Sequence, residues 1–171
     1  MGNSILIRKA RPIDVSEVVD INNAEFKWLG GEPETRDFFH EYLNTDFFWV
    51  AEDSNRIIGA MLVLPENAKN YGSSNFDWFK NRAKEYPKFL YVDRIVVKPD
   101  RQGKGIGSSL YKKLFEYYPT RPICCEIAIK PEVNGGSIRF HEHLGFEAVG
   151  ERTYTVNDKE KTVRYFCKRP F

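Results

Sequence analysis

The chain has 171 residues, of which 42% are hydrophobic, 15% aromatic and 29% charged. This composition excludes a disordered tail, a collagen-like chain and a low-complexity linker, and the length predicts a single domain over residues 1–171. The formal net charge of +2 is too small to indicate a nucleic-acid-binding protein, although residues 1–86 carry 10 Lys and Arg against 14 Asp and Glu, and residues 87–171 carry 16 against 10.

Neither a membrane-spanning segment nor a secretory signal is predicted. The longest apolar run, residues 57–64, contains a glycine and is far shorter than the roughly 20 residues of a transmembrane helix. The first residues lack the basic start, apolar stretch and cleavage site of a signal peptide. We therefore expect a cytoplasmic protein with no membrane partner. The cysteines Cys124, Cys125 and Cys167 have neither a disulfide framework nor a metal-binding spacing, so we expect small core residues.

The predicted elements follow the order β-α-α-β-β-β-α-β-α-β-β. Hydrophobic periodicity and turn residues place the strands at 5–10, 47–52, 57–64, 89–98, 123–130, 146–156 and 161–168. The same patterns place the helices at 15–26, 35–43, 106–118 and 137–144. Asp14 is the expected N-cap of the first helix, with Glu17 completing a capping box. This order predicts a mixed sheet with helices on its faces.

Two segments in the middle of the chain stand out. Residues 65–88 are expected to form a long irregular insert, and connections of that length are usually functional or mobile. The strand that follows it ends in the apolar run Ile95-Val96-Val97, which is typical of a central strand covered on both faces.

A glycine-rich turn joins this strand to the next helix, in the sequence Gln102-Gly103-Lys104-Gly105-Ile106-Gly107-Ser108. The first amides of a helix have no intrahelical acceptor, and the helix dipole adds positive potential there, so a diphosphate is the expected ligand. The spacing matches neither a P-loop nor a dinucleotide-binding fingerprint. It matches the pattern Gln102-x-x-Gly105-x-Gly107 after a hydrophobic strand.

With these motifs, the sequence resembles the GCN5-related N-acetyltransferase (GNAT) family. The turn is similar to the family's Q/R-x-x-G-x-G/A motif, and a second element, from Asn134 to Gly145-Phe146, resembles its asparagine-initiated helix. The element order also agrees, so the resemblance covers nearly the whole chain. It implies an α/β (mixed α+β) fold whose mostly antiparallel sheet splays between the fourth and fifth strands, with helices on both faces.

The resemblance implies an acyltransferase that uses acetyl-CoA as co-substrate and acetylates a primary amine by direct attack in a ternary complex. The acceptor is expected to be a small-molecule amine or a protein amine. By resemblance, the residues that bind the cofactor are Ile95, Val96, Val97, Gln102, Gly103, Lys104, Gly105, Ile106, Gly107, Ser108 and Asn134. Asn134 is expected at the pantetheine arm, and the amides of residues 95–97 at the arm and the carbonyl oxygen.

Glu126 is the predicted general base, because it is the one acid in an otherwise apolar strand and stands where some family members place theirs. A carboxylate paired with an arginine such as Arg94 is the structural alternative. Asp93 is the competing base. Strand alternation predicts that Asp93 and Arg94 point to opposite faces, so that only one of them shares the cleft.

His141 occupies the place of the tyrosine that protonates the coenzyme A thiolate in many family members. An imidazolium could donate the same proton, and a hydrogen-bonded structural histidine is the alternative. His40 and His143 are expected at the surface, and the three scattered histidines give no ligand spacing, so no metal is predicted.

The aromatic insert supplies candidate substrate-binding residues. Tyr71, Asn75 and Trp78, together with Asp93, could line an acceptor pocket, and a hydrophobic cluster under a long loop is the alternative. Two other functions stay open: a non-catalytic acyl-CoA-binding sensor or regulatory module, which the missing tyrosine suggests, and an interaction module that uses the basic second half. The sequence leaves the acceptor and a homodimer undecided.

Overall fold

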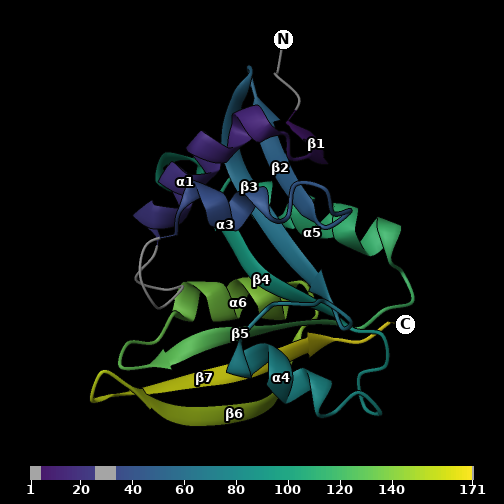
Figure 1. Ribbon diagram of the computed structural model, residues 1–171, viewed down its shortest axis with the longest axis vertical. Helices are drawn as coiled ribbons and strands as arrows, with labels where there is room; N and C mark the ends of the chain where they lie inside the picture. Colours follow the sequence, from purple (N-terminus) through teal and green to yellow (C-terminus); the bar gives the residue numbers. More distant parts are fainter. Residues whose placement is uncertain (1–4, 26–33, 171) are drawn as a thin grey trace. The chain divides into compact units, whose positions relative to one another are not determined.

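A computed structural model describes residues 5–25 and 34–170 (Figure 1). The seven strands of these residues form one sheet in the order β1-β2-β3-β4-β5-β7-β6. Strands β4 and β5 are parallel, whereas β1 with β2, β2 with β3, β5 with β7 and β6 with β7 are antiparallel. The predicted mixed, mostly antiparallel sheet is therefore confirmed.

The elements agree with the predicted order except for one additional helix. The strands are β1 (Leu6–Lys9), β2 (Phe48–Asp53), β3 (Arg56–Pro65), β4 (Leu90–Val97), β5 (Ile123–Lys130), β6 (Glu147–Val156) and β7 (Lys159–Lys168). The helices are α1 (Val15–Ala24), α3 (Arg36–His40), α4 (Ser74–Lys80), α5 (Ile106–Tyr117) and α6 (Gly135–His143). Two short 3-10 turns, η1 (Pro12–Asp14) and η2 (Pro99–Arg101), precede α1 and α5.

The chain folds into two compact units. Unit 1 consists of Met1–Val63 and Asp93–Pro119, and unit 2 consists of Leu64–Val92 and Thr120–Phe171. Strand β4 therefore contributes its first residues to unit 2 and its last residues to unit 1.

In unit 1, helices cover both faces of strand β2. Phe48 packs against Phe39 of α3, with ring centroids 5.7 Å apart. The next residue, Trp49, packs against Tyr117 of α5 at 5.0 Å. Because neighbouring residues of a strand point to opposite faces, α3 and α5 lie on opposite faces. The apolar side of α1 joins the cluster around Phe39 and Phe48, where each fully buried side chain contributes about 1.5–3 kcal/mol.

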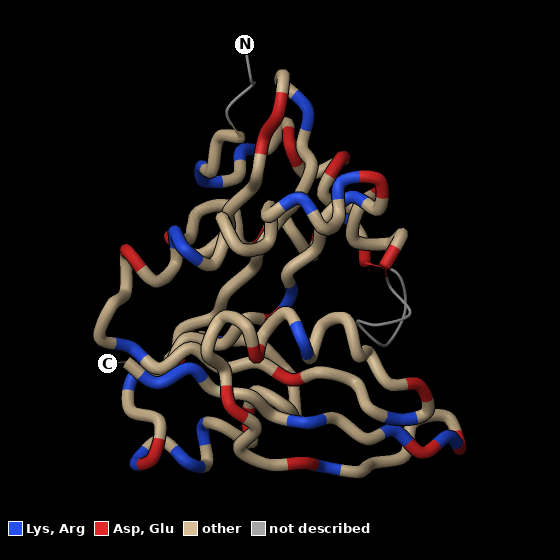
Figure 2. Tube along the Cα trace, turned by 180° about the vertical axis from the view of Figure 1, so that it is seen from behind, with Lys and Arg blue, Asp and Glu red and all other residues tan. Residues whose placement is uncertain are grey.

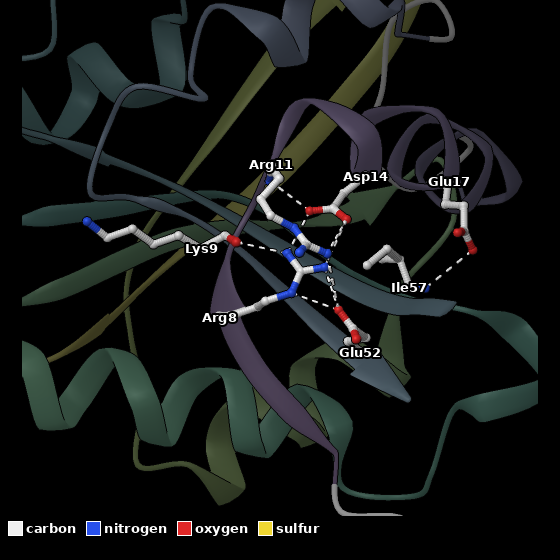
Figure 3. Close-up of polar contacts among 7 residues, drawn as sticks. All are labelled: Arg8, Lys9, Arg11, Asp14, Glu17, Glu52 and Ile57. Atoms are coloured by element: carbon white, nitrogen blue, oxygen red, sulfur yellow. Dashed lines mark hydrogen bonds and ion pairs between the residues drawn. The ribbon is translucent and has the colours of Figure 1, made fainter. Parts of the chain in front are cut away.

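The start of α1 differs from the prediction (Figure 3). The Asp14 carboxylate accepts hydrogen bonds from the Arg8 guanidinium at 2.6 and 2.9 Å and from the Arg11 amide at 2.7 Å. It makes no side-chain cap bond to α1, and Glu17 accepts from the Ile57 amide instead. Asp14 is the N-cap residue of α1, as predicted, but the predicted capping box is wrong, because a charge-assisted bond to Arg8 is stronger than a cap bond.

We expect Asp14→Ala to lower the free energy of unfolding at pH 7 by about 2 kcal/mol, because it removes charged hydrogen bonds from a nearly buried carboxylate. Burial acts to raise the pKa of Asp14, but the bonds from Arg8 and Arg11 outweigh it, so the pKa is lowered. The stabilisation is therefore present above the unfolded-state pKa and is lost as the pH falls through the lower folded-state value.

Urea unfolding at pH 7 and in steps below pH 4 measures this effect. The difference between wild type and Asp14→Ala should shrink on the acid side. Asp46→Ala, which removes an exposed ion pair with Lys9, serves as the control and should change stability little. An equal difference at every pH would contradict the role of the Asp14 charge.

In unit 2, the expected irregular insert contains helix α4. Ser73 caps it by accepting a hydrogen bond from the Phe76 amide at 3.4 Å, and Phe76 and Phe79 are completely buried. A helix of this length is not stable by itself, so its formation depends on packing that the local sequence does not reveal. The expectation of irregular structure is wrong for Ser74–Lys80.

The cysteines and the surface agree with the predictions. Cys124, Cys125 and Cys167 are buried and form no disulfide bond, and burial raises the pKa of Cys124. His40 and His143 are exposed. Basic and acidic residues are interleaved along the trace of both units (Figure 2). No helix within the described ranges is long and apolar enough to cross a membrane.

Candidate functional site

The glycine-rich turn in unit 1 has the geometry of an anion-binding loop. Gly103 and Gly105 have φ values of 73° and 78°, a left-handed conformation that favours glycine. Gly105 is the N-cap of α5, and the first hydrogen bond of the helix runs from the Ser109 amide to the Gly105 carbonyl at 2.9 Å. The amides of residues 106–108 therefore precede the helical ladder and point out of the start of α5.

Side chains of the same unit fix this turn. Gln102 donates to the Val97 carbonyl and to Glu25, each at 3.2 Å. Arg101 forms an ion pair with Asp53 of β2 at 2.9 Å, and Lys104 donates to the Asp100 carbonyl at 3.1 Å. These contacts connect the turn to β2 through Asp53, to β4 through Val97 and to the end of α1 through Glu25.

The space in front of the turn is open. A Cβ atom added to Gly103 or Gly105 would meet no atom within 4 Å, and Gln102, Lys104 and Ser108 are exposed. A diphosphate fits this arrangement, because its oxygens could approach the amides without side-chain obstruction.

Close packing joins the turn to β3 behind it. An added Cβ at Gly59 would lie 3.1 Å from both Ile106 and the Val96 carbonyl, so a larger residue would force these neighbours to shift and the glycine favours the close approach of β3 to the start of α5. The expectation that Ile95-Val96-Val97 is covered on both faces of the sheet is wrong. Only Val96 is buried, in the cluster around Phe39 and Phe48, whereas Ile95 and Val97 are half-buried. The residues covered on both faces are Leu90–Val92 at the other end of β4.

Glu126 lies in a hydrogen-bonded cluster within unit 2. Its Oε1 accepts from the side-chain Nδ2 of Asn75 at 3.1 Å, and its Oε2 accepts from the Tyr91 hydroxyl. The Tyr165 hydroxyl donates to Asn75 Oδ1 at 3.0 Å. Glu126 is half-buried, whereas Tyr91 and Tyr165 are completely buried.

The competing base, Asp93, is bound within unit 1. Its Oδ2 lies 2.5 Å from Arg94 Nε, and Arg94 also bonds to Asn22 and Glu34 at 3.2 Å. The expected opposite orientation of Asp93 and Arg94 does not hold for their charged ends, because the long arginine side chain reaches back to its neighbour. Burial acts to lower the pKa of Arg94, but the interactions with Asp93 and Glu34 together have the larger effect, so the pKa is raised.

The second predicted element begins at Asn134, which is the N-cap of α6. Its Oδ1 accepts from the Ser137 amide at 3.1 Å. His141, in the last turn, is buried between Phe140 and Phe146, and its Nδ1 lies 2.8 Å from the Ser137 carbonyl. Burial lowers the pKa of His141 although the bond to Ser137 opposes it.

The aromatic residues of the insert pack into unit 2. Trp78 stacks on Tyr165 with centroids 4.2 Å apart, and the Arg82 guanidinium lies 3.8 Å from the Trp78 ring centre. Tyr71 contacts Phe76 and Tyr91. Trp78 and Tyr71 are nevertheless half-buried, so part of each ring remains accessible. Across the described part of the chain, no three His, Cys, Asp or Glu side chains gather as metal ligands.

A comparison of the sequence with protein-family models tests the family resemblance that the motifs suggest. The model of the acetyltransferase (GNAT) family matches residues 15–146, which include the glycine-rich turn, β5 and α6. The chain belongs to the acetyltransferase (GNAT) family. The predicted fold is that of the family, and the matched residues include the turn before α5 and the Asn134 cap.

Curated relatives of this GNAT chain are distant. N-acetyltransferase 8F1 of Rattus norvegicus is 23% identical over 121 residues, which are 70% of this chain and 48% of the relative. Uncharacterized N-acetyltransferase MJ1530 of Methanocaldococcus jannaschii is 25% identical over 167 residues, 97% of this chain and 93% of that protein. The chain spans about half the length of the rat relative and of a second relative, MJ1207 from the same archaeon, of which it covers 43%.

Solved structures show the same fold at low identity. Arabidopsis thaliana NAA60 in complex with a bisubstrate analogue has a TM-score of 0.73 at 16% identity, covering 96% of this chain and 97% of that one. Ribosomal-protein-alanine N-acetyltransferase from Brucella melitensis has a TM-score of 0.71 at 21% identity, covering 96% of this chain and 99% of that one. The acetyltransferase yncA from Salmonella typhimurium with its cofactor acetyl-CoA has a TM-score of 0.70 at 16% identity, covering 98% of this chain and 94% of that one.

Sequence reasoning missed two members of the Glu126 cluster in this GNAT chain. Tyr91 and Tyr165 lie in strands whose pattern predicts apolar core residues. A buried tyrosine hydroxyl usually finds a hydrogen-bond partner, so a tyrosine within an apolar strand was the available signal. The partner itself depends on strand register, which the sequence does not specify.

Proposed function

We propose that this chain is an acetyl-CoA-dependent N-acetyltransferase that acetylates a primary amine by direct attack in a ternary complex. The observation that carries the proposal is the open turn before α5, with two left-handed glycines and a helix start behind them. The relative from Salmonella typhimurium is described with acetyl-CoA as its cofactor, which supports the same ligand for this turn.

Each part of the cofactor has proposed binding residues. The amides from Gly103 to Ser108 bind the pyrophosphate, and the Lys104 charge adds attraction to it. Gln102 maintains the turn through its bond to the Val97 carbonyl. Asn134 binds the pantetheine arm, and the amides of residues 95–97 bind the arm and polarise the thioester carbonyl.

The bound acetyl-CoA supplies an acyl group on a thioester. The neutral amine nitrogen bonds to the carbonyl carbon, the carbon–sulfur bond breaks, and Glu126 accepts the proton that the nitrogen loses. Asp93 remains the competing base, although its carboxylate is bound by Arg94. The leaving thiolate takes up a proton and departs as the free thiol.

The resemblance to the family suggests His141 as the residue that donates this last proton to the thiolate. An imidazolium is needed for it, but burial lowers the pKa of His141, so the ring is neutral near pH 7. Its Nδ1 is directed at the Ser137 carbonyl. These features favour the structural alternative, in which His141 holds the first turn of α6, and we propose solvent as the proton source for the thiolate.

The proposed acceptor is an amine in a small molecule or at a protein terminus. Tyr71, Asn75, Trp78 and Asp93 are the proposed substrate-binding residues, and the half-buried rings of Tyr71 and Trp78 offer apolar contact. The relative from Brucella melitensis is named for the acetylation of a ribosomal protein's alanine, which supports including peptides with free N-termini among the acceptors tested.

Calorimetric titration with acetyl-CoA, followed by free-thiol release with a panel of amines, amino acids and peptides, tests the proposal. We expect saturable binding and thiol release that depends on the amine and equals the acetylated amine formed. Binding without transfer to any amine would support the acyl-CoA sensor instead. Absence of binding to pure, folded protein would overturn the proposal, and salt-dependent RNA binding would then favour the interaction module.

A further inference from the structure

We infer that Asn75 and Tyr91 are positioning residues that hold the Glu126 carboxylate in one orientation for proton transfer. The inference deepens the proposed function and rests on it. All of the residues involved lie in unit 2, and three come from neighbouring strands. From the sequence alone, Glu126 is a predicted base and Asn75 a predicted substrate contact, whereas Tyr91 and the link among the three residues follow only from the structure.

Strand register brings the cluster together. Glu126 of β5 is paired directly with Tyr165 of β7, so both side chains stand on the same face. Tyr91 of β4 is paired with Cys124, two residues before Glu126. Because residues two apart share a face, Tyr91 and Glu126 also project to the same side. Asn75, at the start of α4, completes the cluster.

The two carboxylate oxygens of Glu126 have different donors. Asn75 Nδ2 binds Oε1 at 3.1 Å, and the Tyr91 hydroxyl binds Oε2. Since the two donors come from separate elements and each holds one oxygen, rotation of the carboxylate about its last bond breaks both contacts. A half-buried base is thereby held in a fixed plane, which is what proton abstraction from a bound amine requires.

A third contact fixes the donor itself. The Tyr165 hydroxyl donates to Asn75 Oδ1 at 3.0 Å, so the amide of Asn75 must turn its NH2 group toward Glu126. Burial raises the pKa of Tyr165, although Arg152 opposes the shift, so the hydroxyl keeps the proton that it donates. Trp78, stacked on Tyr165, keeps α4 against this strand face.

The kinetic test compares Tyr91→Phe and Asn75→Ala with the wild type, alone and combined with Glu126→Gln. Misplacement of a reacting group by about 1 Å costs about 100-fold, so we expect each single variant to lower kcat about 10- to 100-fold with an unchanged KM for acetyl-CoA. In the Glu126→Gln background, Tyr91→Phe should not slow the enzyme further, and Asn75→Ala should retain only the loss from its proposed contact with the acceptor. A purely structural role would instead give additive losses in both backgrounds and would overturn the inference.

Tyr86→Phe is the matched control. Tyr86 is a buried tyrosine that packs on Phe79 and Trp78 in the same unit, and no role in the reaction is proposed for it. This variant should retain the wild-type kcat. A loss as large as that of Tyr91→Phe would mean that the loss of a buried tyrosine hydroxyl elsewhere in unit 2 has the same effect, which would contradict a specific effect through Glu126.

A second readout does not depend on activity. In 15N NMR spectra, the side-chain NH2 signals of Asn75 are identified by their loss in Asn75→Ala. They should move in Glu126→Gln and in Tyr165→Phe and stay in place in Tyr86→Phe. Unmoved signals in the first two variants would overturn the inference. If these signals respond as expected but the wild type transfers no acetyl group, the proposed function fails while the hydrogen-bonded cluster stands.

Discussion

Glu126→Gln should lower kcat about 100- to 10,000-fold at neutral pH, the range that a general base contributes. Glutamine has nearly the same shape and can still bond to Asn75 and Tyr91, but it cannot accept the proton that the attacking amine loses. The loss should be largest at low to neutral pH. It should shrink toward high pH, where the amine reaches the neutral form without a base.

Rates measured between about pH 6 and pH 10 test this expectation, together with calorimetric titration of acetyl-CoA, whose affinity should persist. Glu142→Gln is a matched control, because Glu142 is an exposed glutamate on α6 of the same unit, and its rates should equal those of the wild type. Equal rates for wild type and Glu126→Gln at every pH would remove Glu126 from the mechanism. A large loss in Asp93→Asn alone would transfer the role to Asp93.

Gly105→Val should weaken acetyl-CoA binding at least about tenfold. The left-handed conformation of Gly105, with φ of 78°, costs a residue with a Cβ about 1–2 kcal/mol, and 1.4 kcal/mol corresponds to tenfold in affinity. A valine also places its side chain in the open space in front of the turn. Both effects turn the amides at the start of α5 away from the ligand.

Calorimetric titration with acetyl-CoA measures this effect, and a thermal melt without ligand shows whether the variant is folded. Gly72→Val is the matched control: it also introduces a side chain into open space, but its backbone is not in the left-handed region. Its affinity should equal that of the wild type. An unchanged Kd for folded Gly105→Val would disprove the proposed role of the turn.

Local patterns predicted most of the fold. The strands and the closing hairpin follow from alternation and turn residues, and the motif at Gln102–Gly107 depends on spacing within a short segment. Helix α4 escaped prediction because its seven residues are held by the burial of Phe76 and Phe79 rather than by a periodic pattern. The predicted capping box at Asp14 failed for a related reason, since the strongest partner of the Asp14 carboxylate, Arg8, lies in another element.

The candidate site was predictable only as separate residues. Glu126 could be found as an acid in an apolar strand, because that needs no knowledge of its neighbours. Its donors could not, since the approach of Tyr91 depends on the register between β4 and β5, and that of Asn75 depends on the packing of α4. For Arg94, the sequence suggested Glu126 as a partner, whereas the structure gives it Asp93, Glu34 and Asn22.

The missing side chain at Gly150 makes room for the indole of Trp78, since an added Cβ there would lie 2.7 Å from Trp78 Cζ2. Trp78 of α4 therefore lies against β6 at Gly150, and α4 also contacts β7 through the stacking of Trp78 on Tyr165 and the hydrogen bond between Tyr165 and Asn75. A methyl group at Gly150 would overlap the Trp78 ring, so the indole would have to move. A change in β6, outside the proposed acceptor contacts, would thus displace Trp78, which the proposed function assigns to acceptor binding.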